Sequence, residues 1–113
     1  MSEPIAVIAV YRFKASVAED AMRVLLVEHR ATLVAEGLVS ERTPWVLQSR
    51  VDPTELVEVF EWKDEAAGRA AGSNPRVLAV WGKFAAQCET VGLSLAKTAE
   101  AAAPFAHFKS WRM

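Results

Sequence analysis

The first apolar run of the chain has no polar face. Residues 5–13 alternate between two sets of side chains: Ile5, Val7, Ala9, Tyr11 and Phe13 on one side, and Ala6, Ile8, Val10 and Arg12 on the other. Runs rich in β-branched and aromatic residues are typical of strands. A strand that is apolar on both faces is buried on both faces. The pattern therefore predicts a first strand that must be covered from two sides.

A helix is predicted after this strand. Ser16 and Glu19 have the spacing of a capping box. Apolar residues then recur at helical spacing, with one histidine among them: Met22, Leu25, Leu26, His29 and Leu33. Gly37 is suited to the position just past a helix end. We therefore expect a helix of about 20 residues whose buried face includes His29.

A β-hairpin is predicted next, with strands at 45–51 and 55–62. The connection Asp52-Pro53-Thr54 has turn chemistry, because proline fixes its own φ and aspartate bonds to the backbone nearby. The second strand alternates Leu56, Glu58, Phe60 and Trp62 with Val57, Val59 and Glu61. Neither of its faces is uniformly polar.

Two helical segments, a last strand and an aromatic tail complete the chain. Asp64 can cap a short helix over 65–71, and Asn74 followed by Pro75 is typical of a second helix start. The expected apolar stripe of the second helix is Val77, Leu78, Trp81, Phe84, Ala85 and Cys88. A strand over 91–98 comes next. The tail, 99–113, carries Phe105, Phe108 and Trp111.

The element order βαββαβ predicts an α+β fold. Two crossovers that flank a hairpin give a ferredoxin-like antiparallel four-stranded sheet with the helices on one face. The other face of the apolar first strand then needs a cover, and a second copy of the chain is the simplest one. We therefore expect a homodimer through the open sheet face, forming a dimeric α+β barrel. Residues 1–98 form one domain, and the tail 99–113 packs on that domain or on the partner subunit.

Composition excludes several classes of protein. The 113 residues are 52% apolar and carry a net charge of −1, which argues against disorder and gives no electrostatic reason to bind nucleic acid. No apolar run reaches the length of a membrane helix. The single cysteine, Cys88, excludes an internal disulfide and indicates a reducing, cytoplasmic location. Two distant histidines give no metal-binding pattern, so we expect no metal.

The hairpin and the helical segments after it resemble a known family. The segments Val57-Glu58-Val59-Phe60-Glu61-Trp62, Asp64-Glu65-Ala66-Ala67 and Ser73-Asn74-Pro75 are similar to the antibiotic biosynthesis monooxygenase domain, a branch of the dimeric α+β barrel superfamily. The resemblance covers residues 4–98. It implies a cofactor-independent monooxygenase acting on planar phenolic or polyketide-like small molecules. Such an enzyme deprotonates an electron-rich phenol, whose anion passes an electron directly to O₂.

The sequence departs from the family pattern at one frequent histidine position, which is Ala71 here. This departure favours an alternative: a non-catalytic module that binds a small molecule or dimerises on the same fold. Haem binding or degradation is a third hypothesis. Haem-degrading relatives share a tryptophan that Trp62 matches, but their asparagine falls at or near Tyr11 and their histidine near Val80 or Trp81.

Three residues are candidate catalytic groups: His29, Tyr11 and Glu58. Histidine is suited to general base catalysis at neutral pH. Tyr11 can donate or accept a proton, and burial makes a carboxylate such as Glu58 a better base. Each residue also has a structural explanation, as a hydrogen-bonded core histidine, a core aromatic ring and a paired carboxylate.

Five further residues are candidate substrate-binding groups. Trp62, Phe60 and Trp81 could form an aromatic wall for a planar apolar ligand, although core packing explains them equally well. Arg12 and Arg50 end strands and could orient an anionic oxygen, unless they are simply solvated strand ends. His107 in the tail is expected at a packing surface or interface, and Cys88 is expected to act as a small hydrophobic residue.

Overall fold

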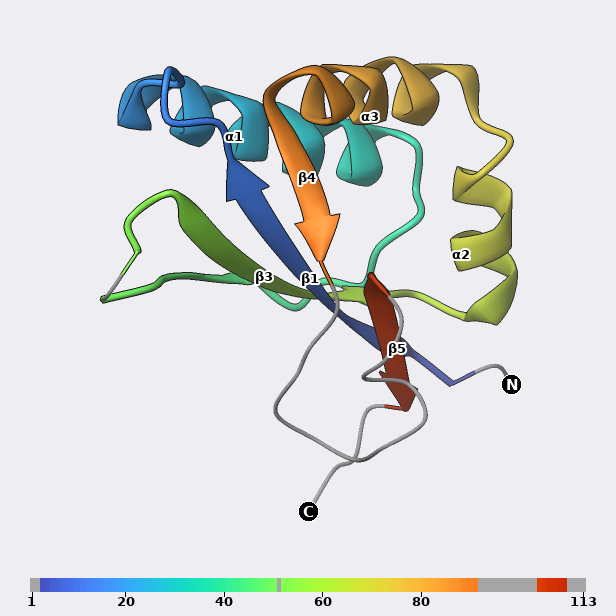
Figure 1. Ribbon diagram of the computed structural model, residues 1–113. Coiled ribbons are helices and arrows are strands. Elements are labelled where there is room, and N and C mark those ends of the chain that lie inside the picture. The colour runs from blue at the N-terminus through green and yellow to red at the C-terminus, as the bar shows by residue number, and fades with distance from the viewer. Residues whose placement is uncertain (1–2, 51, 92–103, 110–113) are drawn as a thin grey trace.

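A computed structural model describes residues 3–50, 52–91 and 104–109, without the side chains of residues 108 and 109 (Figure 1). The elements in chain order are β1 (Ile5–Phe13), α1 (Glu19–Ala35), β2 (Trp45–Gln48), β3 (Glu55–Trp62), α2 (Glu65–Ala71), α3 (Pro75–Gln87), β4 (Cys88–Val91) and β5 (Phe105–Lys109). The strands form one antiparallel sheet, and the helices cover one of its faces. The α+β fold class expected from the element order is confirmed.

β1 is the centre of the sheet. One of its edges pairs with β3, so that Ala9 lies opposite Glu58 and Tyr11 opposite Leu56. Its other edge is shared by two strands, because β4 pairs with Val10–Phe13 and β5 pairs with Ile5–Ala9. The described sheet therefore has five strands where the sequence predicted four. The additional strand comes from the aromatic tail, which adds to the edge that β4 leaves unpaired.

The alternation of β1 places the core on its helix side. Val7, Ala9, Tyr11 and Phe13 are each at most 3% exposed there. On the opposite face Val10 is buried, whereas Ala6 and Ile8 remain partly exposed. The neighbouring open-face residues Trp45 and Leu47 of β2 are 68% and 49% exposed. A large apolar surface is thus left on the face that the helices do not cover.

Local sequence signals set the ends of the helices. Asp64 accepts a hydrogen bond from the backbone N–H of Ala67, and Asn74 accepts from those of Arg76 and Val77, as predicted. Gly37 follows α1 with a φ of 68°, a left-handed conformation that glycine adopts without strain. These three predictions are confirmed.

Four local predictions are wrong. The Ser16 capping box does not form, because a turn from Lys14 to Val17 precedes the helix and Ala18 becomes its N-cap. In α3, Leu78 and Ala85 face solvent, and Val80 is buried in their place. Cys88 begins β4 instead of ending the helix, and β2 ends at Gln48. Residues 92–98 of the predicted last strand, and Trp111, lie outside the described residues.

The described helices are also too short or too polar to cross a lipid bilayer.

Candidate active site

Two cavities lie between the sheet and the helices. The larger, which we call the α1 cavity, has a volume of about 690 Å³ and lies between α1 and the β2–β3 hairpin. It is lined by Glu19, Met22, Arg23, Leu26, Val27, Arg30, Ala31, Thr43, Pro44, Val46, Gln48, Leu56 and Glu58. The smaller, which we call the aromatic cavity, measures about 230 Å³. It is lined by Val7, Tyr11, His29, Phe60, Trp62, Gly68, Gly72, Trp81, Phe84, Phe105 and His107.

A buried polar cluster joins the walls of the two cavities. The Tyr11 hydroxyl donates to Glu58 Oε1 over 2.8 Å, and His29 Nδ1 lies 3.2 Å from the same oxygen. All three residues are at most 3% exposed. The His29–Glu58 contact lacks the alignment of a hydrogen bond. The three candidate catalytic residues, which come from β1, α1 and β3, therefore meet at one oxygen atom.

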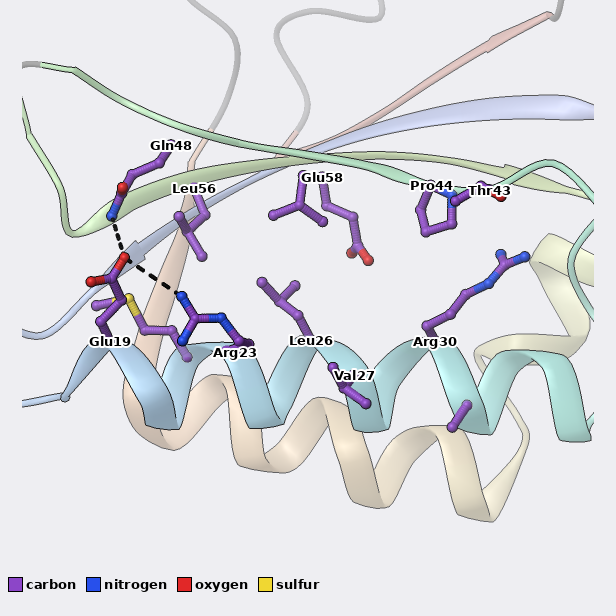
Figure 2. A pocket seen from close by; sticks show the side chains of 13 residues that line it. Glu19, Arg23, Leu26, Val27, Arg30, Thr43, Pro44, Gln48, Leu56 and Glu58 are labelled. Atoms are coloured by element: carbon purple, nitrogen blue, oxygen red, sulfur yellow. Dashed lines mark hydrogen bonds and ion pairs between the residues drawn. The ribbon is translucent and has the colours of Figure 1, made fainter.

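Glu58 turns its second oxygen toward the larger cavity. Figure 2 shows its side chain extending from β3 into the space above α1. Its Oε2 atom accepts no hydrogen bond from any described residue, in contrast to Oε1. Glu58 Oε2 can therefore accept a hydrogen bond from a ligand in the α1 cavity.

Tyr11 serves this carboxylate as a hydrogen-bond donor. The pKa of Tyr11 is raised well above its ordinary value, mainly by burial and in smaller part by the negative charge and hydrogen bond of Glu58. The phenol therefore stays protonated at neutral pH and holds Glu58 Oε1 in place. This geometry makes Tyr11 a positioning residue and removes it as a candidate base.

His29 is fixed from two sides. The indole N–H of Trp81 donates to His29 Nε2 over 3.1 Å, so a neutral ring carries its own hydrogen on Nδ1, facing Glu58. The edge of the imidazole also packs against the faces or edges of Phe60 and Phe84. The one basic nitrogen of His29 is therefore already occupied, which makes His29 a partner of Glu58 and not a free base.

The aromatic cavity has a flat wall made of two coplanar rings. Trp62 Nε1 donates to His107 Nε2 over 3.0 Å, and the ring planes differ by only 14°. Because this bond joins the ring edges, a centroid separation of 6.5 Å means that the rings lie side by side in one plane. Gly68 of α2 lets the indole lie this close, since a Cβ there would be 3.1 Å from Trp62 Nε1. The predicted aromatic wall of Trp62, Phe60 and Trp81 belongs to this cavity.

Arg12 and Arg50 lie apart from both cavities. Arg12 is on the open side of β1, where it forms exposed ion pairs with Glu55 and Glu89 at 3.3 Å each. Arg50 is exposed in a bend after β2. Neither lines the α1 cavity or the aromatic cavity, so the expectation that they orient an anionic oxygen there is not supported by their positions. Strand-end arginines turn to solvent unless a partner holds them inward.

Two residues are closer to the cavities than the sequence predicts. The helical pattern places Arg30 among the polar residues of its helix, yet Arg30 is partly buried and lines the α1 cavity. A packing role is predicted for His107, and β5 brings its ring against Trp62. Ala71, the family histidine position, is fully buried in α2. Burial raises the pKa of the Cys88 thiol to about 11, which is consistent with the role of a small hydrophobic residue.

No metal or haem ligand set emerges from the side chains that are described. They contain no group of three or more His, Cys, Asp or Glu residues that could hold a metal ion. His29 and His107 each have Nε2 bonded to an indole N–H.

Comparison with known proteins identifies the fold. No family model and no curated protein matches the chain. Among solved structures, SnoaB, a cofactor-independent oxygenase from Streptomyces nogalater, is similar with a TM-score of 0.70 and 13% identity, over 99% of this chain and 97% of that one. A protein described as a candidate antibiotic biosynthesis monooxygenase from Chloroflexus aurantiacus is similar with a TM-score of 0.59 and 21% identity, over 76% of this chain and 82% of that one. A protein from Shewanella oneidensis is similar with a TM-score of 0.61 and 16% identity, over 79% of this chain and 84% of that one.

These identities are low, so the likeness concerns the backbone and not the chemistry. It agrees with the family resemblance of the hairpin and the helical segments after it. The chain therefore has the ferredoxin-like fold found in the antibiotic biosynthesis monooxygenases.

Proposed function

We propose that this protein is a cofactor-independent oxygenase that acts on an electron-rich phenolic or polyketide-like aromatic molecule. The observation that carries the proposal is Glu58: a buried carboxylate, held at Oε1 by Tyr11, with Oε2 unpartnered among the described residues at an apolar cavity of about 690 Å³. This volume lies in the range of ligand sites, about 300–1,000 Å³, whereas the aromatic cavity is smaller. The substrate therefore occupies the α1 cavity.

The reaction begins with a proton transfer from the phenol to Glu58, which leaves a phenolate. The phenolate passes one electron to O₂, and the resulting phenoxyl radical combines with superoxide at a ring carbon to give a peroxide anion. Glu58 returns its proton to this anion, which becomes a hydroperoxide. Where that carbon carries a hydrogen, loss of water gives a carbonyl group. One O₂ is consumed, with one atom retained in the product and one released as water.

Neighbouring groups adapt to the change of charge at Glu58. Before the transfer, the Tyr11 hydroxyl donates to the carboxylate. After it, the phenolate takes over the negative charge within a low-dielectric cavity, where the interaction with any nearby cation is strong. Apolar side chains such as Leu26 and Leu56 limit access of water to this anion.

Glu58→Gln tests this function. The amide is nearly isosteric but cannot accept a proton, so we expect oxygen consumption with anthrones and hydroquinones to fall by about 10²–10⁴-fold. Glu55→Gln, on the same strand but exposed beside Arg12, is the matched control and should keep the activity. An oxygen electrode provides the measurement. Unchanged turnover in Glu58→Gln would refute Glu58 as the base, and no turnover by the wild type would refute the oxygenase.

The alternative of a non-catalytic binding module predicts a cavity without convergent polar groups. Tyr11, His29 and Glu58 meet at one oxygen atom, but only Glu58 of the three lines the α1 cavity. The lining alone therefore does not separate the enzyme from the binding module. The two hypotheses differ in one observable: a binding module takes up the phenol without consuming O₂.

We also propose that the protein is a homodimer, joined through the open sheet face, in the cytoplasm. Support comes from the exposed apolar side chains on that face, with Trp45 and Leu47 the most exposed. Trp45→Glu should raise the dissociation constant at least about tenfold, because it places a charge in an apolar interface. Val34→Glu, on the outer side of α1, is the matched control. If the wild type sediments as a monomer at micromolar concentration in a velocity experiment, the dimer is contradicted.

A further inference from the structure

Arg30 lies on the wall of the α1 cavity opposite Glu58. Its Nη2 donates to the backbone oxygens of Ser40 and Arg42, at 3.4 and 3.2 Å, in the connection between α1 and β2. Figure 2 shows Arg30 rising from α1 while Glu58 extends down from β3, so the two side chains approach the same space from opposite sides. The backbone contacts hold the guanidinium in place without neutralising its charge.

The other terminal nitrogen of Arg30 lacks an acceptor. Nη1 is buried, and no described residue accepts its hydrogens. A buried donor without a partner costs free energy, so such groups are usually satisfied by a partner from outside the chain. Among the described residues, Arg30 and Glu58 form no ion pair with each other. Two residues on separate walls of the cavity thus have an unmet group among the described residues: Arg30 a donor and Glu58 an acceptor.

These two groups define complementary ends of a ligand. An aromatic hydroxyl can donate to Glu58 Oε2, while a second oxygen accepts from the Arg30 guanidinium. When the hydroxyl and a carbonyl are conjugated, deprotonation moves negative charge onto the carbonyl oxygen. The guanidinium then forms a charge-assisted hydrogen bond, which is stronger than a neutral one. Apolar residues between the two ends, such as Leu26 and Val27, are suited to the ring system.

We propose that Arg30 is the second polar anchor of the α1 cavity and selects hydroxyarenes that carry a conjugated carbonyl oxygen. This inference rests on the function proposed above, because it assumes that a phenol occupies this cavity. Arg30 binds the ligand and stabilises its anion, and Glu58 takes the proton. The preferred ligand is a planar molecule with a hydroxyl and a carbonyl on one conjugated ring system.

The experiment compares two probes of the same three-ring outline, 2-hydroxyanthraquinone and 2-anthrol, by anaerobic equilibrium dialysis. We expect the wild type to bind the carbonyl probe at least about tenfold more tightly at a pH where it ionises. Arg30→Gln should abolish this preference and retain the affinity for 2-anthrol. The absorption band of bound, ionised 2-hydroxyanthraquinone should weaken in the same variant.

Arg69→Gln is the matched control, since Arg69 is an exposed arginine of α2 that is paired with Glu65 and lines neither cavity. It should keep the preference. Arg30→Lys provides a second variant if Arg30→Gln does not fold. It keeps the positive charge but loses the planar guanidinium, so its preference for the carbonyl probe should be reduced but still present.

Three results would overturn the inference. Equal affinity of the wild type for both probes, or a preference that survives in Arg30→Gln, would overturn it and leave the proposed function intact. If Arg30→Gln loses its affinity for both probes together, Arg30 only supports the adjoining backbone. If the wild type binds neither probe and consumes no O₂, the proposed function fails as well.

Discussion

The α1 cavity and the aromatic cavity share a wall but differ in how their polar groups are satisfied. In the aromatic cavity, each imidazole accepts an indole N–H: His29 from Trp81, and His107 from Trp62. In the α1 cavity, Glu58 Oε2 and Arg30 Nη1 have no partner among the described residues. His29 Nδ1 also lacks a hydrogen bond, but it lies 3.2 Å from Glu58 Oε1 and so belongs to the same polar cluster. Unmet donors and acceptors indicate where a ligand binds.

This contrast reverses the simplest expectation from the sequence. A run of aromatic residues suggests a stacking site for a planar substrate, and Trp62, Phe60 and Trp81 do form such a wall. Their hydrogen bonds, however, are made within the protein. We therefore assign the proposed chemistry to Glu58, the one residue of the buried polar cluster that lines the larger cavity.

The first prediction, with the largest expected effect, concerns the closed network of the aromatic cavity. Trp81→Phe removes the donor to His29 Nε2 and leaves a buried acceptor unmet, so the free energy of unfolding should fall by about 2 kcal/mol. Urea denaturation followed by circular dichroism measures the loss.

A second substitution separates the hydrogen bond from the lost volume. If the bond matters, the double variant His29→Leu/Trp81→Phe should lose less stability than the sum of the single variants. Strict additivity would contradict a coupled His29–Trp81 pair.

The second prediction concerns access to the α1 cavity. Val27 and Val24 are both on α1 and are 64% and 66% exposed, but only Val27 lines this cavity. Val27→Trp should obstruct the cavity and weaken 2-anthrol binding by at least about tenfold, equivalent to about 1.4 kcal/mol. Val24→Trp should leave the affinity unchanged. Equal effects of the two substitutions, measured by anaerobic calorimetry, would place the ligand elsewhere.

The third prediction compares two helical glycines. A Cβ on Gly68 would contact the Trp62 indole at 3.1 Å, and Trp62 is held by His107 and Phe60, so Gly68→Ala should destabilise the protein by about 1 kcal/mol. Gly82 in α3 has open space, and Gly82→Ala should stabilise it by about 0.5–1 kcal/mol. Thermal unfolding distinguishes them. A stabilising Gly68→Ala would show that the flat aromatic wall shifts easily.

The fourth and smallest effect is a pH dependence at the shared wall. Tyr11 is the chain's only tyrosine, so phenolate absorbance near 295 nm reports on it alone. Because its pKa is raised in the folded protein by burial and by Glu58, its contribution to stability is complete below the unfolded pKa, about 10, and is lost as pH rises toward the folded value. Glu58→Gln should move the phenolate transition to lower pH. An unshifted transition would contradict the Tyr11–Glu58 bond.

Local sequence signals predict much of this fold. The alternation of β1, the side chain of Asp64, the pair Asn74-Pro75 and the left-handed Gly37 each act within a few residues, and each indicates the correct structure. The strand of the tail is not predicted, because its pairing with β1 joins residues about 100 positions apart, and no local pattern encodes that register.

The members of the candidate site can be predicted from the sequence, but their arrangement cannot. Glu58, Tyr11 and His29 are candidates because of their chemistry, and their meeting at one oxygen atom depends on the tertiary structure. Arg30 is not found, because a charged side chain in a helix carries no sequence signal of partial burial. Its position results from the path of the connection after α1, where the carbonyl groups of Ser40 and Arg42 hold it against the cavity.

A crystal structure of the protein with 2-anthrol, prepared without oxygen, tests the central claim most directly. We predict that the ring system lies in the α1 cavity, with its hydroxyl oxygen within about 3 Å of Glu58 Oε2. A ligand bound in the aromatic cavity, against the coplanar rings of Trp62 and His107, would contradict the assignment of Glu58 as the base.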